Sequence, residues 1–223
     1  MKPTVLFGCL LSAVLLIVSC SKEKDPMPLF GKKRVTIEKQ LETLADLGLT
    51  LNSGVGEEQL TTFEDRSALE TTPYKGLIEA MGFELEEEPY TPLCDPLWMC
   101  DYERVEDHGA YVEVLQRLER MTSGTLGLTN MRDQVDLEEE VAWLEFDHQG
   151  QRVRWEFEVD DDWLDPTILI KYDDLLESSG VQVRIYSNHT DYGQVAFLGA
   201  FSPDQKTRFD RIARVKLSRL PRD

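Results

Sequence analysis

The clearest periodic pattern lies in the second half of the chain, where apolar and polar residues alternate. Within residues 152–159, Val153, Trp155 and Phe157 are separated by arginine and glutamate. A period of two is typical of a strand with one buried face. A polar turn at Gly150 separates this run from a second apolar run, which indicates a hairpin. The predicted strands are 140–147 and 152–159 in one hairpin, and 181–186 and 194–199 in another.

Apolar residues spaced three and four positions apart predict helices elsewhere. In residues 109–121, Tyr111, Val114 and Leu118 share one helical face, and charged residues occupy the opposite face. Asp165 followed by Pro166 is typical of a helix N-terminus. The predicted helices are 36–47, 73–81, 109–121, 165–177 and 202–215. Short strands are expected at 49–52, 83–86 and 126–129, a helical turn within 57–71, and a long ordered loop at 88–107.

The order of these elements indicates the fold class. Hairpin, helix, hairpin and helix follow one another, which favours an α+β fold with a mostly antiparallel sheet and helices packed on one face. Residues 36–223 are expected to form the folded body, either as one unit or as lobes 36–131 and 132–223. No linker-like break follows residue 35, which favours a single body.

The net charge of the chain favours some classes of binding partner over others. The 223 residues include 24 basic and 42 acidic side chains, for a formal net charge of −18. Such a surface is repelled by nucleic acid and anionic lipid, so we expect no nucleic-acid binding. Cationic proteins or peptides are the favoured partners, unless the acidity serves only solubility.

The first twenty residues have the pattern of an export signal. Lys2 precedes an apolar stretch that ends at Val18, which is shorter than the roughly 20 residues of a transmembrane helix. Residues 16–20, LIVSC, resemble a bacterial lipoprotein lipobox. The resemblance implies that residues 1–19 are a signal peptide and that Cys20 is acylated after cleavage, with several acyl chains giving stable anchoring.

The segment after the lipobox has the composition of a tether. Residues 20–35 combine the lipidated cysteine with prolines, a glycine and five lysines or arginines. The run CSKEKD also resembles the start of Bacteroidota surface lipoproteins. We therefore expect attachment to the bacterial outer membrane, on its cell-surface face or its periplasmic face.

The two remaining cysteines are close in sequence. Cys94 and Cys100 flank a turn signal, Asp95 and Pro96, in a chain expected to reach an oxidising compartment. This spacing favours a disulfide over free thiols. A metal site is not expected, because only two sulfur ligands are present and the nearest histidine is His108.

The strongest candidate site is an acidic junction between a predicted strand and a predicted helix. Asp160, Asp161, Asp162 and Trp163 could contact a partner protein, since tryptophan is enriched at binding hot spots. Alternatively, the aspartates are solvated and Trp163 belongs to the core. Calcium is disfavoured, because no Asp-x-Asp-x-Asp-Gly loop with a distal glutamate is present.

Catalytic signatures are not found. The sequence contains no Gly-x-Ser-x-Gly, His-Glu-x-x-His, P-loop or dinucleotide fingerprint. We expect a protein that is not an enzyme and needs no cofactor, although a carboxylate pair has no fixed spacing that would reveal it.

Residues 155–194 resemble small bacterial immunity proteins of toxin secretion systems, through their paired strands, the Asp-Asp-Trp-Leu-Asp junction, a helix and a final hairpin with Gly193 and Gln194. The resemblance implies a lipidated protein that intercepts a toxin at the envelope, and it assigns no residue roles. The alternative is an accessory or structural lipoprotein of a secretion, motility or uptake assembly.

Overall fold

The computed structural model describes residues 34–189 and 193–220, which belong to one compact unit. The predicted signal peptide, Cys20 and nearly all of the predicted tether lie outside the described residues. The helices are α1 (Ile37–Ala45), α2 (Glu57–Leu60), α3 (Arg66–Thr71), α4 (Lys75–Met81), α5 (Ala110–Met121), α6 (Thr167–Ser178) and α7 (Pro203–Ile212). The strands are β1 (Leu97–Asp101), β2 (Thr129–Asp136), β3 (Val141–His148), β4 (Gln151–Phe157), β5 (Arg184–His189), β6 (Val195–Phe201) and β7 (Ser218–Arg219).

These strands form two antiparallel sheets. One sheet has the order β1-β6-β5-β7, and the other has the order β2-β3-β4. The prediction of an α+β fold with antiparallel sheets is confirmed. Both predicted hairpins are present, as β3–β4 and β5–β6.

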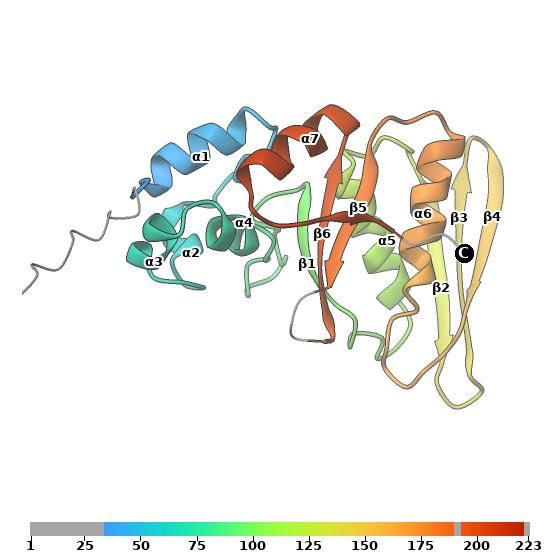
Figure 1. The fold of residues 1–223 in the computed structure, drawn as a ribbon. Coiled ribbons are helices and arrows are strands. Elements are labelled where there is room, and N and C mark those ends of the chain that lie inside the picture. The colour runs from blue at the N-terminus through green and yellow to red at the C-terminus, as the bar shows by residue number, and fades with distance from the viewer. Residues whose placement is uncertain (1–33, 190–192, 221–223) are drawn as a thin grey trace, which may run out of the picture. The chain divides into compact units, whose positions relative to one another are not determined.

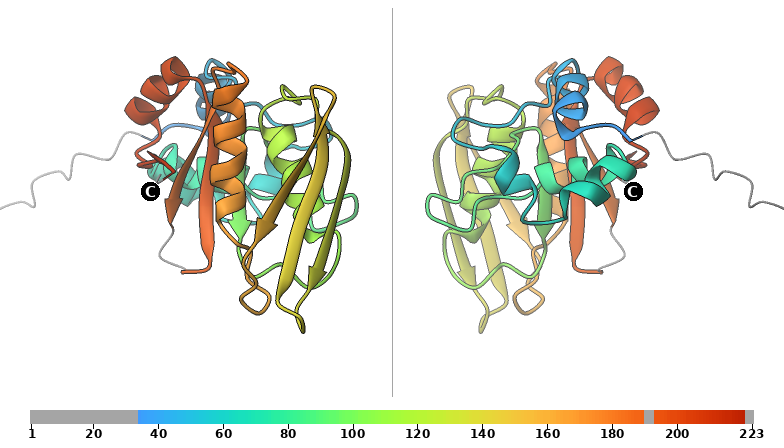
Figure 2. Two further views of the ribbon diagram at one scale, coloured as in Figure 1. Left: turned by 90° about the vertical axis from the view of Figure 1, so that its right-hand side faces the viewer. Right: turned by 90° about the vertical axis from the view of Figure 1, so that its left-hand side faces the viewer.

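Helices cover both faces of the four-stranded sheet, rather than the single face that the sequence predicted. Along β6, Ala196 and Leu198 enter the core that contains α5 and α6, whereas Phe197 and Phe201 enter the core that contains α1, α4 and α7. Figures 1 and 2 show α5 and α6 between the two sheets. The composition of β6 explains this arrangement. The strand is apolar at almost every position, and such a strand is buried on both faces.

The predicted loop at 88–107 contains β1, which the periodicity did not reveal. This five-residue strand pairs with β6 across about a hundred residues of sequence, from Leu97 opposite Gly199 to Asp101 opposite Val195. The predicted strand at 49–52 is absent, and the one at 83–86 is reduced to an isolated bridge between Glu84 and Pro92.

A buried arginine joins α5 to β1. The side chain of Arg117 is only 7% exposed, and its guanidinium donates hydrogen bonds to Glu84 Oε1 at 2.8 Å and to the carbonyls of Asp95 at 2.9 Å and Leu97 at 2.6 Å. It also lies over the Trp98 ring, 5.6 Å from its centroid. Burial lowers the pKa of Arg117, while its charge is compensated by Glu84.

Candidate partner-binding site

The acidic junction is held in place by the backbone of the segment that follows β1. The carbonyl of Asp162 accepts hydrogen bonds from the N–H groups of Arg104 at 3.0 Å and Val105 at 2.8 Å, and Leu164 N–H donates to the Tyr102 carbonyl at 2.7 Å. Asp161 has a φ of 52°. Aspartate tolerates this left-handed conformation better than most residues, so the chain turns sharply here.

This turn directs polar and aromatic side chains outward. Asp160 and Asp161 are exposed, Asp162 is half-buried, and Trp163 keeps 39% of its surface exposed. The three carboxylates form no hydrogen bond or ion pair with another described residue. An exposed tryptophan beside unpaired carboxylates is unusual for a purely structural turn.

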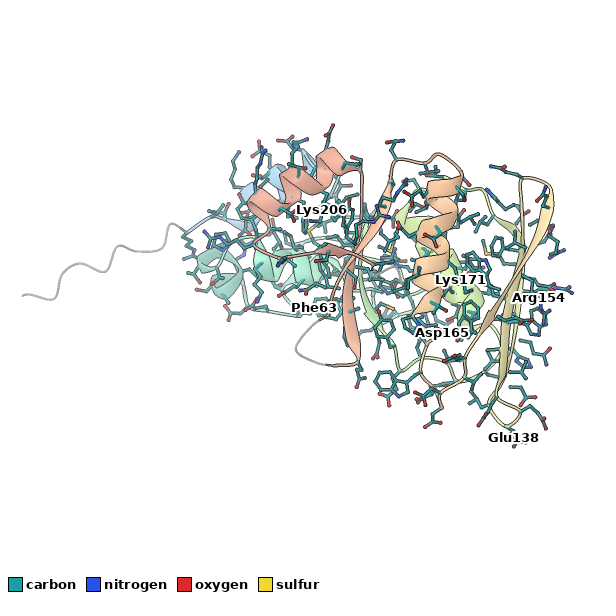
Figure 3. All side chains as sticks on the ribbon, turned by 45° about the vertical axis from the view of Figure 1, so that its right-hand side comes forward. Phe63, Glu138, Arg154, Asp165, Lys171 and Lys206 are labelled. Carbon is teal, nitrogen blue, oxygen red and sulfur yellow. The ribbon has the colours of Figure 1, made fainter. Side chains whose placement is uncertain are left out.

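Asp165 has the capping role that the sequence predicted. Its Oδ1 accepts the N–H of Thr167 at 2.8 Å, and its Oδ2 accepts the N–H of Glu158 at 2.9 Å. One carboxylate therefore closes the start of α6 and fixes the end of the preceding segment. Figure 3 shows Asp165 at this end of α6.

Trp163 lies at an apolar pocket of about 590 Å³. Its walls come from the segment after β1, from α6, and from β5 and β7. The apolar lining side chains are Tyr102, Trp163, Leu164, Pro166, Leu169, Ile170 and Leu220. A pocket of this size accepts one or two apolar side chains, and the neighbouring aspartates favour a cationic flank on whatever enters it.

The sequence predicts the junction but not most of the pocket. Tyr102 follows β1, which lies inside the predicted loop at 88–107, and Ile170 lies inside the predicted helix at 165–177 without any sign that it faces a pocket. The signal for this site was the exposed Asp-Trp run, whereas the pocket required the tertiary pairing of β1 with β6.

The predicted disulfide between Cys94 and Cys100 is wrong. Both residues are fully buried free thiols. Cys94 packs in the core with α1, α4 and α7, while Cys100 packs in the core with α5 and α6. Cys94 precedes β1 and Cys100 lies within it, and the two thiols belong to the cores on opposite faces of the four-stranded sheet. Burial raises the pKa of each thiol to about 12.

The described histidines have structural contacts. His108 Nδ1 accepts the N–H of Val135 at 3.0 Å. His148 is buried, with its ring nitrogens 3.2 Å from the Leu126 carbonyl and 3.0 Å from Ser179 Oγ. Within residues 34–189 and 193–220, no group of three His, Cys, Asp or Glu side chains is arranged to hold a metal ion.

Comparisons with known proteins add no assignment. No protein-family model matches the chain, and searches of curated proteins and of solved structures found no match. In the part of the chain that the structure describes, no helix has the length and apolar character needed to cross a bilayer.

Proposed function

We propose that this chain is a lipid-anchored envelope protein that binds another protein through Trp163 and the adjacent aspartates. The observation that carries the proposal is an exposed tryptophan at the edge of an apolar pocket, next to three carboxylates without partners among the described residues. The immunity-type resemblance of residues 155–194 supports a toxin as the partner.

The carboxylates and the tryptophan have different roles in the proposed binding. The net charge of −18 and the Asp160–Asp162 carboxylates attract a basic protein and raise its association rate. Trp163 and the pocket beside it then supply the apolar burial that slows dissociation. The partner should therefore present an apolar side chain flanked by lysine or arginine.

The binding test compares matched variants of the full-length protein in affinity capture from envelope and secreted proteins of the source organism. Trp163→Ala should weaken capture of one dominant basic protein by about thirtyfold or more, as expected for a hot-spot tryptophan. Asp160→Asn/Asp161→Asn/Asp162→Asn should mainly slow association. The control is Glu138→Gln/Glu139→Gln/Glu140→Gln, an equal loss of charge at the β2–β3 turn (Figure 3).

The outcomes of this experiment separate the candidate functions. A single partner that depends on Trp163, whose toxicity is relieved by co-expression of this chain, supports the immunity function. Capture of several envelope proteins favours the accessory-lipoprotein alternative. Equal capture by wild type and every variant rules out the junction as the interface.

The anchor has its own test. Radiolabelled palmitate should be incorporated into the wild-type chain and into Cys9→Ser, because Cys9 lies in the part that is removed. Cys20→Ser should abolish labelling. Labelling that persists in Cys20→Ser would disprove lipidation at this residue, independently of the capture result.

A further inference from the structure

A second cavity, of about 690 Å³, lies on the α4 side of the four-stranded sheet. Its walls come from the segments around α4, from β1, β5 and β6, and from residues 214–216 after α7. Its volume is within the usual range for small-ligand sites. The charged residues that line this cavity are not part of the Asp160–Trp163 junction. The cavity could therefore have a function of its own.

The floor of this cavity is apolar. The rings of Phe63 and Phe83 are stacked, with centroids 4.3 Å apart and planes within 8° of each other. Met99 and Phe197 complete the floor from β1 and β6. A β-carbon at Gly82 would lie only 2.8 Å from the Phe197 ring, so glycine is required for this packing.

The acidic side of the cavity carries Glu64 and Glu79. The Glu64 carboxylate lies against Gly76, in space that a β-carbon would fill. Burial raises the pKa of Glu79, opposed by Lys75 at 3.9 Å and reinforced by the charge of Glu64. Glu79 is half-buried and Glu64 is exposed, and the two neighbouring carboxylates favour the arrival of a positively charged group.

The basic side carries Arg214 and Lys216. Arg214 has a φ of 51°, a left-handed conformation that turns the chain after α7 and is uncommon for arginine. Both cations line the same cavity as Glu64 and Glu79. Neither forms an ion pair with a described residue, although opposite charges face the same space. Other cations of the folded body are mostly paired, as Lys206 is with Asp210.

We propose that this cavity binds a short peptide with free termini and an apolar side chain. The ammonium group would lie between Glu64 and Glu79, the carboxylate would lie at Arg214 and Lys216, and the apolar side chain would pack on Phe83, Met99 and Phe197. A purely anionic ligand would face the two glutamates, and a purely cationic ligand would face Arg214, Lys216 and Lys75, which also lines the cavity. Only a zwitterion with an apolar body satisfies all three parts of the lining.

The test is calorimetric titration of the full-length protein with alanyl-leucyl-alanine and its two blocked forms. The free tripeptide should bind, and N-acetylation or C-terminal amidation should each weaken binding by about tenfold, as expected for loss of charge-assisted hydrogen bonds. These three titrations use the wild-type protein alone, so the result does not depend on the folding of any variant.

Charge variants then show which side chains bind the carboxylate of the peptide and which bind its ammonium group. Arg214→Gln/Lys216→Gln should weaken the free tripeptide by about tenfold and make amidation irrelevant. Glu64→Gln/Glu79→Gln should also weaken binding of the free tripeptide by about tenfold, and N-acetylation should then have no further effect. Arg208→Gln/Arg211→Gln removes two exposed charges from α7 that do not line the cavity, and binding should be unchanged.

Three results would overturn the proposal. One is the absence of binding by the free tripeptide at millimolar concentration. Another is equal affinity of the free and blocked forms. The third is an equal loss of affinity in the α7 control, which would indicate a general charge effect. Because this experiment uses no protein partner and no lipid, its failure leaves the proposed protein-binding function unaffected.

Discussion

At the scale of single residues, the two buried thiols give the most direct prediction. Burial raises the pKa of Cys94 and Cys100 to about 12, so neither is ionised near neutral pH. Iodoacetamide at pH 8 should leave both unmodified in the folded protein and should modify both in concentrated urea. Mass spectrometry of the tryptic peptides measures this. A peptide in which the two sulfurs are joined would contradict the structure.

Glu145 on β3 provides a pH-dependent prediction. It accepts hydrogen bonds from Arg154 at 2.9 Å and from Arg132 at 2.9 Å, and both arginines hold its pKa below the ordinary value of 4.5. A lowered folded-state pKa means that ionised Glu145 stabilises the fold fully above the unfolded-state value. That contribution is lost as the pH falls through the folded-state value.

The variant Glu145→Gln should therefore be less stable than wild type at pH 7, and the difference should shrink towards pH 3. Urea unfolding at several pH values measures it. Glu156→Gln is the matched control, because Glu156 is 79% exposed and 3.5 Å from Arg154. It should show a smaller pH-dependent difference. A constant difference between wild type and Glu145→Gln across this range would exclude the ion pairs as its source. Arg154 is visible on β4 in Figure 3.

At the scale of elements, the connection between α5 and β1 depends on Arg117. Arg117→Ala would leave Glu84 and two carbonyls without their donor, and breaking a buried ion pair of this kind costs about 3 kcal/mol. Arg120→Ala is the control on the same helix. Its pair with Asp95 is 44% and 37% exposed, so its loss should cost about 1 kcal/mol or less.

Urea unfolding monitored by tryptophan fluorescence measures both free energies. Arg117→Lys should recover only part of the loss, because an ammonium group cannot reproduce the fork of three hydrogen bonds. Equal destabilisation by Arg117→Ala and Arg120→Ala would contradict the role assigned to the buried guanidinium.

The sequence predicted elements whose own periodicity is strong and missed those defined by distant partners. Helix α5 and the β3–β4 hairpin follow from local alternation of apolar and charged residues. Strand β1 has only five residues and is recognisable mainly through its pairing with β6. Strand β2 is largely polar, since Val135 is its one fully buried residue. The Asp160–Trp163 junction was predictable from composition, but its pocket depends on where β1 places Tyr102.

At the scale of the whole molecule, the two sheets differ in the sequence separation of their strands. The β2-β3-β4 sheet is assembled from the contiguous residues 129–157. In the other sheet, β1 pairs with β6, which follows it by about a hundred residues, and β7 pairs with β5 at the opposite edge. Closing a long loop costs more conformational entropy than closing short hairpins. We expect amides of β3 to be protected before those of β1 in pulsed hydrogen exchange during refolding. Simultaneous protection would contradict this order.

The position of β6 between β1 and β5 also has a consequence during synthesis. Until residues 195–201 have left the ribosome, β1 has no strand to pair with. Both apolar cores also lack the side chains that β6 contributes to them. The larger sheet therefore cannot close on a partly translated chain. During synthesis, the β2-β3-β4 sheet can therefore form first, and the larger sheet can form only once β6 is available to pair with β1.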